Sequence, residues 1–384
     1  MPAFNREEYR ARVSRLRSSM RERGIDTLLV MNEANMNYLT GYDGYSDYVP
    51  QLALVCQDEE DAWLILREMD IQCATATTYL DPSRLLAYPE SYIGSANRSP
   101  WQPIGAMVRE RSRSTRFGIE LTATSYGIKA HTELGKVLDM EHAVDADRMV
   151  SRLKLLKSSS ELEYMEQAGR IADHALMAGQ LAIMVGAREC DVAAAVMSAL
   201  CSGTPELSGG PPRPPTMPVG RIATAPHLKW TDARYVEGSQ TNFEIGAFRQ
   251  RYCCALSRTV YLGVPPARLR YIHSAVVDGF SAALAAIRPG ATCSDVDRAF
   301  RKVFTPRGVR KESRIGYSIG IDWADGGASL QSDDDTVLQP NMSFHLIVGI
   351  WEQDEGYVFS ETVRVTDQGS SSLSRLGRDM LIND

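Results

Sequence analysis

Apolar and polar residues repeat with two different periods along the first 147 residues. Residues 5–24 repeat apolar side chains at helical spacing, and Gly24 follows where such a helix would end. Short apolar runs typical of strands lie at 26–31, 51–56, 62–66 and 116–120, and helical patterns lie at 103–111 and 125–138. Strands and helices of these lengths in mixed order predict a small α/β domain over residues 1–147.

The pattern changes from residue 148 onward, where longer helices and longer strands are expected. Helices are predicted at 158–184, 189–200, 269–287 and 294–304, and strands at 241–248, 258–262, 343–349 and 362–365. Residues 202–218 contain two adjacent glycines and six prolines, which predicts a long loop. Strands that pair across such helices predict an α+β domain over 148–384, with a curved antiparallel sheet backed by helices.

Charge and composition exclude several classes of partner. The 384 residues are 44% hydrophobic and carry a net charge of -6, without a long basic run that could follow a phosphate backbone. The N-terminus is charged and lacks the apolar core of a secretory signal, and no apolar run has the length of a membrane span. We expect a cytoplasmic protein that binds neither nucleic acid nor membrane.

Cysteine usage indicates free thiols. The seven cysteines are an odd number with no Cys-x-x-Cys pair, which predicts neither disulfides nor a zinc site. Cys253 and Cys254 are adjacent, but a nucleophilic thiol requires a base within reach, which the sequence does not supply. Their role stays open.

A carboxylate in an apolar strand and a loop histidine are the main candidates for chemistry. Glu244 lies between Phe243 and Ile245, and a buried carboxylate requires a cation, a proton donor or a substrate. One alternative is a structural ion pair with Arg258. His227 follows Pro226 on a loop, and the ordinary pKa of histidine suits proton transfer near neutral pH.

Several motifs together resemble the creatinase and methionine aminopeptidase family, whose fold is called pita-bread, and within it the ectoine hydrolase branch. The residues that carry the resemblance are Asn35 to Tyr45, Ala225-Pro226-His227-Leu228, Phe243-Glu244-Ile245, Leu256 to Val260, Arg314-Ile315-Gly316-Tyr317, Met342-Ser343-Phe344-His345 and Glu361. The resemblance covers nearly the whole chain. It implies a creatinase-type N-terminal domain followed by a pita-bread catalytic domain.

Metallopeptidases of this fold hold two metal ions through five ligands, and the resemblance allows each position to be checked. The five positions fall on Glu244, Ala255, Tyr317, Ile347 and Ser360. One carboxylate cannot hold a divalent pair, because each ion requires several oxygen or nitrogen donors. We therefore expect no metal and no other cofactor.

The resemblance also implies roles for individual residues. The expected catalytic residues are His227, Glu244 and His345, and the expected substrate-binding residues are Tyr42, Asp43, Tyr45, Tyr252, Tyr317, Trp323 and Glu361. In creatinase-like homodimers the N-terminal domain of one subunit covers the site of the other. The first three substrate-binding residues would then line the pocket of the neighbouring subunit.

The expected function is hydrolysis of a C–N bond in a small cyclic amidine or guanidino compound. Ectoine hydrolases follow their Asp-Trp pair with Gly-Glu-Arg, and creatinase has a carboxylate-binding arginine close by. This chain instead has Asp322-Trp323-Ala324-Asp325-Gly326-Gly327, so the exact substrate stays open. The alternatives are a ring-forming or ring-opening enzyme of a specialised pathway, and a non-catalytic small-molecule binding protein on the same fold.

Overall fold

The structure is a computed structural model that describes residues 2–46, 48–112, 116–352 and 354–384. The chain forms two compact units, Met1–Leu153 and Lys154–Asp384. The domain boundary predicted at residue 147 precedes helix α6 (Met149–Lys154), and the first unit takes in most of that helix. Each unit has its own sheet and its own apolar core.

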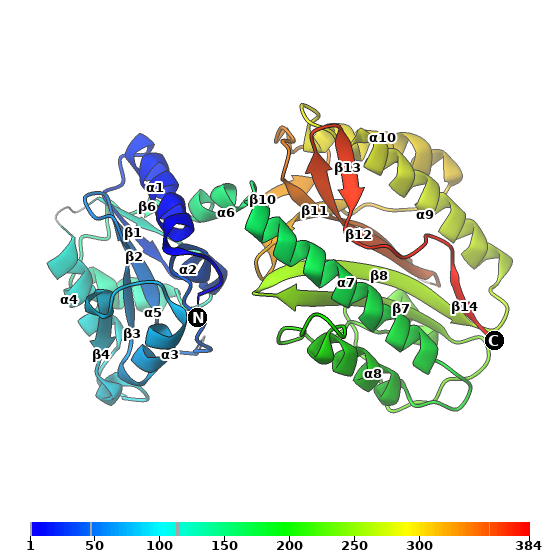
Figure 1. Ribbon diagram of the computed structural model, residues 1–384, viewed down its shortest axis with the longest axis horizontal. Helices are drawn as coiled ribbons and strands as arrows, with labels where there is room; N and C mark the ends of the chain where they lie inside the picture. The colour runs from blue at the N-terminus through cyan, green and yellow to red at the C-terminus, as the bar shows by residue number, and fades with distance from the viewer. Residues whose placement is uncertain (1, 47, 113–115, 353) are drawn as a thin grey trace. The chain divides into compact units, whose positions relative to one another are not determined.

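The first unit is a mixed sheet with helices packed against it (Figure 1). Its strands, in sheet order, are β4 (Leu85–Tyr88), β3 (Trp63–Arg67), β2 (Leu52–Cys56), β1 (Thr27–Val30), β5 (Phe117–Ile119) and β6 (Val144–Asp145). Its helices are α1 (Arg6–Glu22), α2 (Glu33–Thr40), α3 (Ile71–Thr77), α4 (Trp101–Arg111) and α5 (Ile128–Gly135). The strand β1 pairs antiparallel with β2 and parallel with β5, which confirms the predicted α/β arrangement.

The second unit is built on an 8-stranded sheet that is antiparallel except for its β8–β14 pair. The main path runs β10 (Trp323–Leu330), β9 (Gly316–Gly320), β11 (Ser343–Trp351), β12 (Gly356–Thr366), β8 (Tyr252–Leu262) and β14 (Leu381–Asn383). Strand β7 (Gln240–Arg249) pairs with β8, and β13 (Gly369–Ser372) pairs with β12. The helices are α7 (Ser159–Ala182), α8 (Glu189–Ser202), α9 (Ala267–Ala286) and α10 (Cys293–Phe304).

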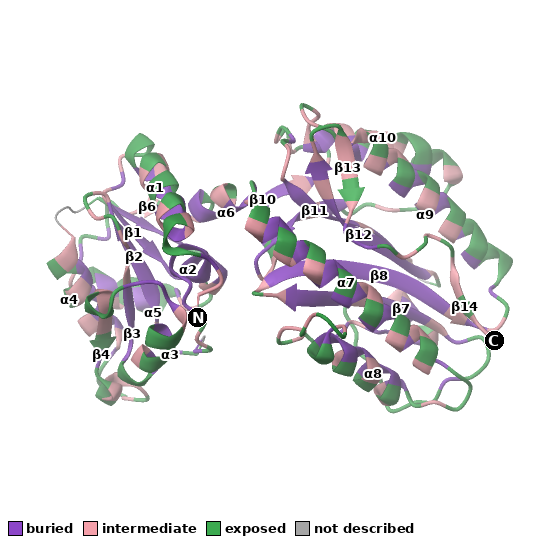
Figure 2. Cartoon of the chain, in the orientation of Figure 1, coloured by how far each residue is buried: buried purple, intermediate pink, exposed green. Residues whose placement is uncertain are grey.

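The two faces of this sheet have different chemistry, because alternate side chains of a strand point to opposite faces. Phe344, Leu346 and Phe359 belong to the apolar core that also contains the inward residues of α9 and α10. The central strands β8, β11 and β12 are mostly buried, whereas the outer surfaces of the helices are exposed (Figure 2). The predicted pita-bread arrangement of a helix-backed antiparallel sheet is confirmed.

The opposite face carries a row of four residues that we call the site row: Glu244, Ser257, Ser360 and Ile347. Glu244 on β7 is paired in register with Ser257 on β8, Ser257 with Ser360 on β12, and Ser360 with Ile347 on β11. Because residues opposite one another in antiparallel strands share a face, their side chains lie side by side. The sheet thus brings together residues that are 116 positions apart in sequence (360 − 244).

Two features of the second unit differ from the prediction. Strand β8 begins at Tyr252 rather than 258, because the run Cys253-Cys254-Ala255 is buried on both faces and shows no alternation. The segment Gly316–Gly320, where no strand is predicted, is strand β9 and pairs with β10 and β11. Among the described residues, no helix is long and apolar enough to cross a lipid bilayer.

Candidate active site

The carboxylate of Glu244 is the one acidic group of the site row, and its side chain is mostly buried. Among the described residues it has no hydrogen-bonding or ion-pairing partner, although the backbone of Glu244 bonds to Thr216 in both directions at 3.0 and 3.1 Å. Burial raises the pKa of Glu244 from 4.5 to about 7, because the charged form loses hydration without gaining a partner. A cation or a hydrogen-bond donor next to this residue would compensate for the burial of its charge.

A chain of hydrogen bonds leads from Trp323 to Ser257, the neighbour of Glu244. The indole nitrogen of Trp323 donates to the Tyr317 hydroxyl at 2.9 Å, and that hydroxyl lies 2.9 Å from Nδ1 of His345. On the other side of the ring, Nε2 of His345 lies 2.7 Å from the Ser360 hydroxyl, which donates to Ser257 at 2.8 Å.

One tautomer of His345 completes this chain with every donor matched to an acceptor. With Ser360 donating to Ser257, Nε2–H donates to Ser360 and Nδ1 accepts from Tyr317. The Ser257 hydroxyl is the last member, and its own proton can be donated toward the position of Glu244. The chain thus ends at the residue that is paired in register with Glu244.

His345, predicted to be catalytic, is enclosed by protein groups, and its catalytic role stays a prediction. Its side chain is 0% exposed, and both ring nitrogens are occupied by protein hydroxyls. Burial, together with the positive charge of Arg314, lowers the pKa of His345 to about 3, so the ring stays neutral near pH 7. The ring is held between the hydroxyls of Tyr317 and Ser360.

The indole of Trp323 is held in place by a strained turn. Asp322 and Trp323 have positive φ angles of 58° and 89°, a conformation that costs an L-residue about 1–2 kcal/mol. An ion pair between Arg251 and Asp322 joins this turn to the β7–β8 hairpin, with Nε 2.9 Å from Oδ1. The indole lies against Gly246, where an added Cβ would be 2.2 Å from the ring.

The Tyr317 ring is also covered by a cation. The guanidinium of Arg314 lies 4.5 Å from the centre of the Tyr317 ring and donates to the Ser329 hydroxyl at 2.7 Å. Burial raises the pKa of Tyr317, the charge of Glu244 raises it further, and Arg314 opposes both effects. The phenol therefore stays protonated and acts as a hydrogen-bonding group.

His227 is exposed and lies on a segment that is joined to Glu244 through the backbone. Thr216 bonds to Glu244, and the next residue, Met217, donates to the carbonyl of Leu228 at 2.9 Å. The segment at Thr216 and Met217 therefore lies between the edge strand β7 and the backbone next to His227. Among the described residues, no hydrogen bond joins the His227 ring to Glu244 or to His345.

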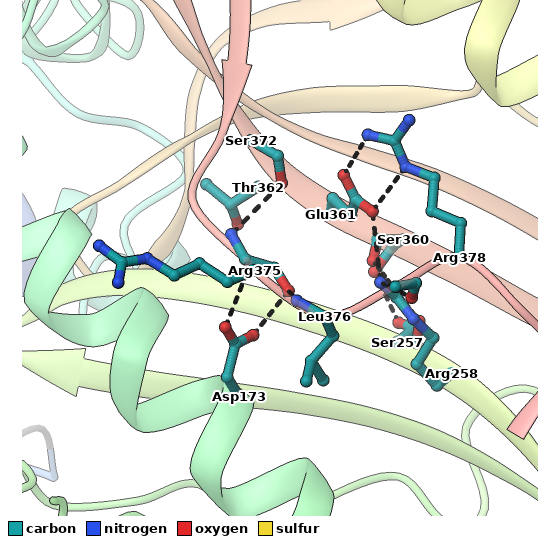
Figure 3. A network of polar contacts seen from close by, with 12 residues as sticks. Asp173, Ser257, Arg258, Ser360, Glu361, Thr362, Ser372, Arg375, Leu376 and Arg378 are labelled. Atoms are coloured by element: carbon teal, nitrogen blue, oxygen red, sulfur yellow. Dashed lines mark hydrogen bonds and ion pairs between the residues drawn. The ribbon is translucent and has the colours of Figure 1, made fainter.

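The structure contradicts the expected substrate-binding role of Glu361. This residue follows Ser360 and points to the opposite face of β12, where both carboxylate oxygens bind arginines (Figure 3). Arg378 forms a two-point pair with it at 3.0 and 2.9 Å, and Arg258 donates at 3.2 Å. Arg258 is thus the partner of Glu361, so the alternative ion pair between Glu244 and Arg258 is also wrong.

Tyr252 is likewise displaced from the expected site. Tyr252 and Arg258 are separated by an even number of positions in β8, so their side chains share a face. That face is opposite to the site row. The Tyr252 hydroxyl donates to Glu161 at 2.6 Å, and its ring stacks on Tyr164. This tyrosine packs helix α7 onto the sheet.

The three predicted site residues of the first unit lie in the segment after helix α2. Tyr42 is buried, and its hydroxyl has no hydrogen-bonding partner among the described residues. Asp43 is exposed, and its backbone N–H donates to the Thr77 hydroxyl at 3.1 Å, whereas Tyr45 is 85% exposed. The three residues thus differ in exposure, and their role in substrate binding stays a prediction.

The adjacent cysteines are poor nucleophiles. Both are fully buried, and burial raises the pKa of the Cys253 thiol well above its usual value and that of Cys254 to about 12. Since the thiolate is the reactive form, neither thiol is prepared for attack. Like the other cysteines of the chain, they are free.

Comparison with known proteins places this geometry in a family. The chain matches the family described as metallopeptidase family M24 over residues 163–367, and the creatinase/prolidase N-terminal domain over residues 12–153. It is 38% identical to an uncharacterized hydrolase/peptidase of Sinorhizobium fredii over 99% of each chain. It is also 33% identical to the ectoine hydrolase of Halomonas elongata, over 99% of this chain and 98% of that one.

The solved structures agree on the fold. The prolidase of Pyrococcus horikoshii is 21% identical and superposes with a TM-score of 0.82, covering 97% of this chain and 100% of that one. The chain therefore belongs to the M24 family, with a creatinase-type N-terminal domain and a pita-bread C-terminal domain. Within that family of hydrolases it is a homologue of ectoine hydrolase, which confirms the resemblance found in the sequence.

The residues at the centre of the sheet do not fit the metal pair that the family name implies. The site row supplies one carboxylate, two hydroxyls and an aliphatic side chain. No group of three or more His, Cys, Asp or Glu side chains that could hold a metal ion occurs among the described residues. Divalent ions bound by oxygen and nitrogen donors require several such ligands.

Two members of the hydrogen-bonded chain were not predicted as site residues. Ser257 lies in the run Leu256 to Val260, and Ser360 was considered only as a lost ligand position. Serines are common in strands, and their chemistry here arises from register across three strands. The alternation of side chains along a strand is the signal that could have found them. Because Ser360 directly precedes Glu361, the two side chains must face opposite sides of the sheet.

Proposed function

We propose that this protein is a metal-independent hydrolase that opens a C–N bond in a small cyclic amidine or guanidino compound. The observation that carries the proposal is the unpaired carboxylate of Glu244 on the site row. An amidinium is planar and positively charged, and two of its N–H groups match the two oxygens of a carboxylate. Such a ligand would offset the free-energy cost of burying the negative charge of Glu244.

In the proposed reaction, Glu244 holds the cationic N–C–N unit or adds to its central carbon. Water supplies the oxygen of the product amide, the C–N bond breaks, and the departing nitrogen receives a proton and leaves as an amine. His227 transfers the proton, because it is a histidine on a loop beside the edge strand. In a cyclic amidine the new carbonyl and the departing amine stay joined by the rest of the ring, so hydrolysis gives one ring-opened product.

The hydrogen-bonded chain from Trp323 to Ser257 supports catalysis by position. It holds Tyr317 and the Ser257 hydroxyl beside the carboxylate, where they can orient water or substrate. A preorganised donor stabilises developing charge without reorganisation during the reaction. His345 acts through its two neighbours in this arrangement.

We further propose a homodimer in which the first unit of one subunit completes the site of the other. The exposed Asp43 and Tyr45 are the residues expected to reach the partner's site. Substituting both with alanine should then reduce turnover while each unit remains folded. Mixing this double variant with Glu244→Gln subunits should restore part of the activity, since one of the two sites would be complete.

The proposal is tested by incubating ectoine, hydroxyectoine and creatine with the protein and following ring-opened product or amine by mass spectrometry. Turnover by the wild type should persist with a chelator present, and Glu244→Gln and His227→Ala should abolish or strongly reduce it. His142→Ala is the matched control, because His142 is an exposed histidine of the first unit. Activity that requires added metal, or cleavage of Xaa-Pro dipeptides, would contradict the proposal.

A further inference from the structure

Side chains bridge the seam between strands β8 and β12, which runs through the site row. Among the described residues, the register pairing of the two strands is limited to Ser257 and Ser360. On one side of this pair, the Thr362 hydroxyl accepts from the N–H of Ala255 and donates to the carbonyl of the same residue, both at 2.9 Å. The contact between the two serines therefore depends on the side chains that join the strands around it.

Arg258 joins the two strands at that contact. Its Nη1 donates to the carbonyl of Ser257 at 3.0 Å and to the carbonyl of Ser360 at 2.8 Å. Its Nη2 donates to Glu361 at 3.2 Å and to the carbonyl of Gly377 at 3.3 Å. The third nitrogen, Nε, is buried and has no hydrogen-bonding partner among the described residues. One guanidinium thus holds both strands at the serines and leaves one donor unused.

The unpartnered Nε gives this guanidinium a second orientation. Arginine pairs most strongly with a carboxylate when two of its nitrogens donate to the two oxygens in parallel. Nε and Nη2 of Arg258 could form such a fork on Glu361, but both oxygens of Glu361 are already held by Arg378, at 3.0 and 2.9 Å (Figure 3). A turn toward that fork would satisfy Nε and draw Nη1 away from the carbonyls of Ser257 and Ser360.

We propose that Arg378 is a positioning residue for the active site and acts through Glu361 and Arg258. By occupying both oxygens of Glu361, it keeps Nη1 of Arg258 on the two serine carbonyls. The two serine hydroxyls, 2.8 Å apart on the other face of the sheet, then stay aligned in the chain from Trp323. The catalytic consequence rests on the proposed function, whereas the alignment itself does not.

Arg375 provides a matched control for Arg378. Both arginines follow strand β13, but Arg375 is held by its backbone N–H, which donates to Asp173 at 2.7 Å. Its side chain is exposed and extends away from the network (Figure 3). Arg375→Gln therefore removes an equal charge without changing the contacts of Glu361, whereas Arg378→Gln frees both oxygens of Glu361.

The ring of His345 reports on the alignment without any substrate. It is fully buried and lies 2.7 Å from the Ser360 hydroxyl, so its ring N–H is shielded from solvent. The chain has six histidines, and NMR of the full chain with isotope-labelled histidine rings, compared with His345→Gln, assigns this signal. Arg378→Gln should shift the signal and speed the exchange of its proton about tenfold. Arg375→Gln should leave both as in the wild type.

Turnover tests the catalytic consequence. With the substrate found for the proposed hydrolase, Arg378→Gln should lower kcat about tenfold with little change in KM, because alignment is lost while Glu244 still binds the substrate. Ser360→Ala should lower kcat as well. Adding Arg378→Gln to Ser360→Ala should lower kcat no further, since the hydroxyl that Arg378 positions is then absent. A purely structural effect of Arg378 would add in full.

Arg378→Lys separates charge from geometry, and it carries the test if the glutamine variant does not fold. Lysine keeps the charge but lacks the planar fork that holds both carboxylate oxygens, so the His345 signal should still shift. An unshifted signal in the Arg378 variants, an equal shift in Arg375→Gln, or full additivity with Ser360→Ala would overturn the positioning role. If the protein proves not to be a hydrolase, the NMR comparison still decides whether Arg378 aligns the two serines.

Discussion

Replacing Glu244 with glutamine should stabilise the protein at alkaline pH. A carboxyl group whose pKa rises from 4.5 when unfolded to about 7 when folded loses about 3 kcal/mol of folding free energy on ionisation. Because the folded pKa is the higher one, the wild type keeps its full stability below pH 4.5 and loses part of it as pH rises toward 7. Glutamine does not ionise, so Glu244→Gln avoids this loss.

The magnitude is an upper value, because the side chain of Glu244 is not completely removed from water. Glu244→Gln should therefore match the wild type near pH 4.5 and exceed it by up to about 3 kcal/mol at pH 8. Glu237→Gln is the matched control, because Glu237 is an exposed glutamate of the same unit and should change stability little at either pH.

Urea unfolding at both pH values measures the difference, with pulsed hydrogen exchange of peptides from β8 as the readout. These peptides report on the second unit alone, which matters because a chain of two compact units need not unfold in a single step. A variant that is less stable than the wild type at pH 8 would refute the reasoning. That result would mean that the carboxylate has a stabilising partner in the free protein.

Three further predictions concern the residues around the site. Glu361→Gln should destabilise the second unit by about 3–5 kcal/mol in the same urea assay, because it leaves Arg258 buried and unpaired, and a small loss would contradict the buried ion pair. His227→Ala should lower kcat about 10²–10⁴-fold with an unchanged melting temperature, and unchanged turnover would remove this histidine from the mechanism. Gly246→Ala should displace the indole of Trp323, seen as altered tryptophan fluorescence and lower turnover, since the new Cβ would meet the ring at 2.2 Å; an unchanged spectrum and rate would show that the indole position is unimportant.

The sequence predicted the elements better than it predicted which face each residue occupies. Helical periodicity placed α7 and α9 within a few residues, because their apolar stripes are long. The Gly-rich strands β9 and β10 lack such a pattern and were missed as strands. Glycine has no side chain to show alternation, so only pairing with β11 reveals the strand.

The candidate site was found where family motifs and physical requirements coincide. Glu244 was identified because a carboxylate between apolar strand residues requires a partner or a chemical role. That requirement holds whichever residues lie near it in the folded chain. Glu361 and Tyr252 were assigned to the site from the resemblance, and both lie next to, or near, ligand positions in sequence. Adjacent residues of a strand face opposite sides, so proximity in sequence was misleading.

The most direct test of the central claim is the affinity of a simple amidinium for Glu244 in protein treated with a chelator. Isothermal titration with acetamidine should show binding to the wild type that is about tenfold weaker at pH 6 than at pH 8, because the carboxylate titrates near pH 7. Glu244→Gln should not bind it measurably at either pH. Equal binding by Glu244→Gln, or binding that appears only after a divalent metal is added, would contradict the account.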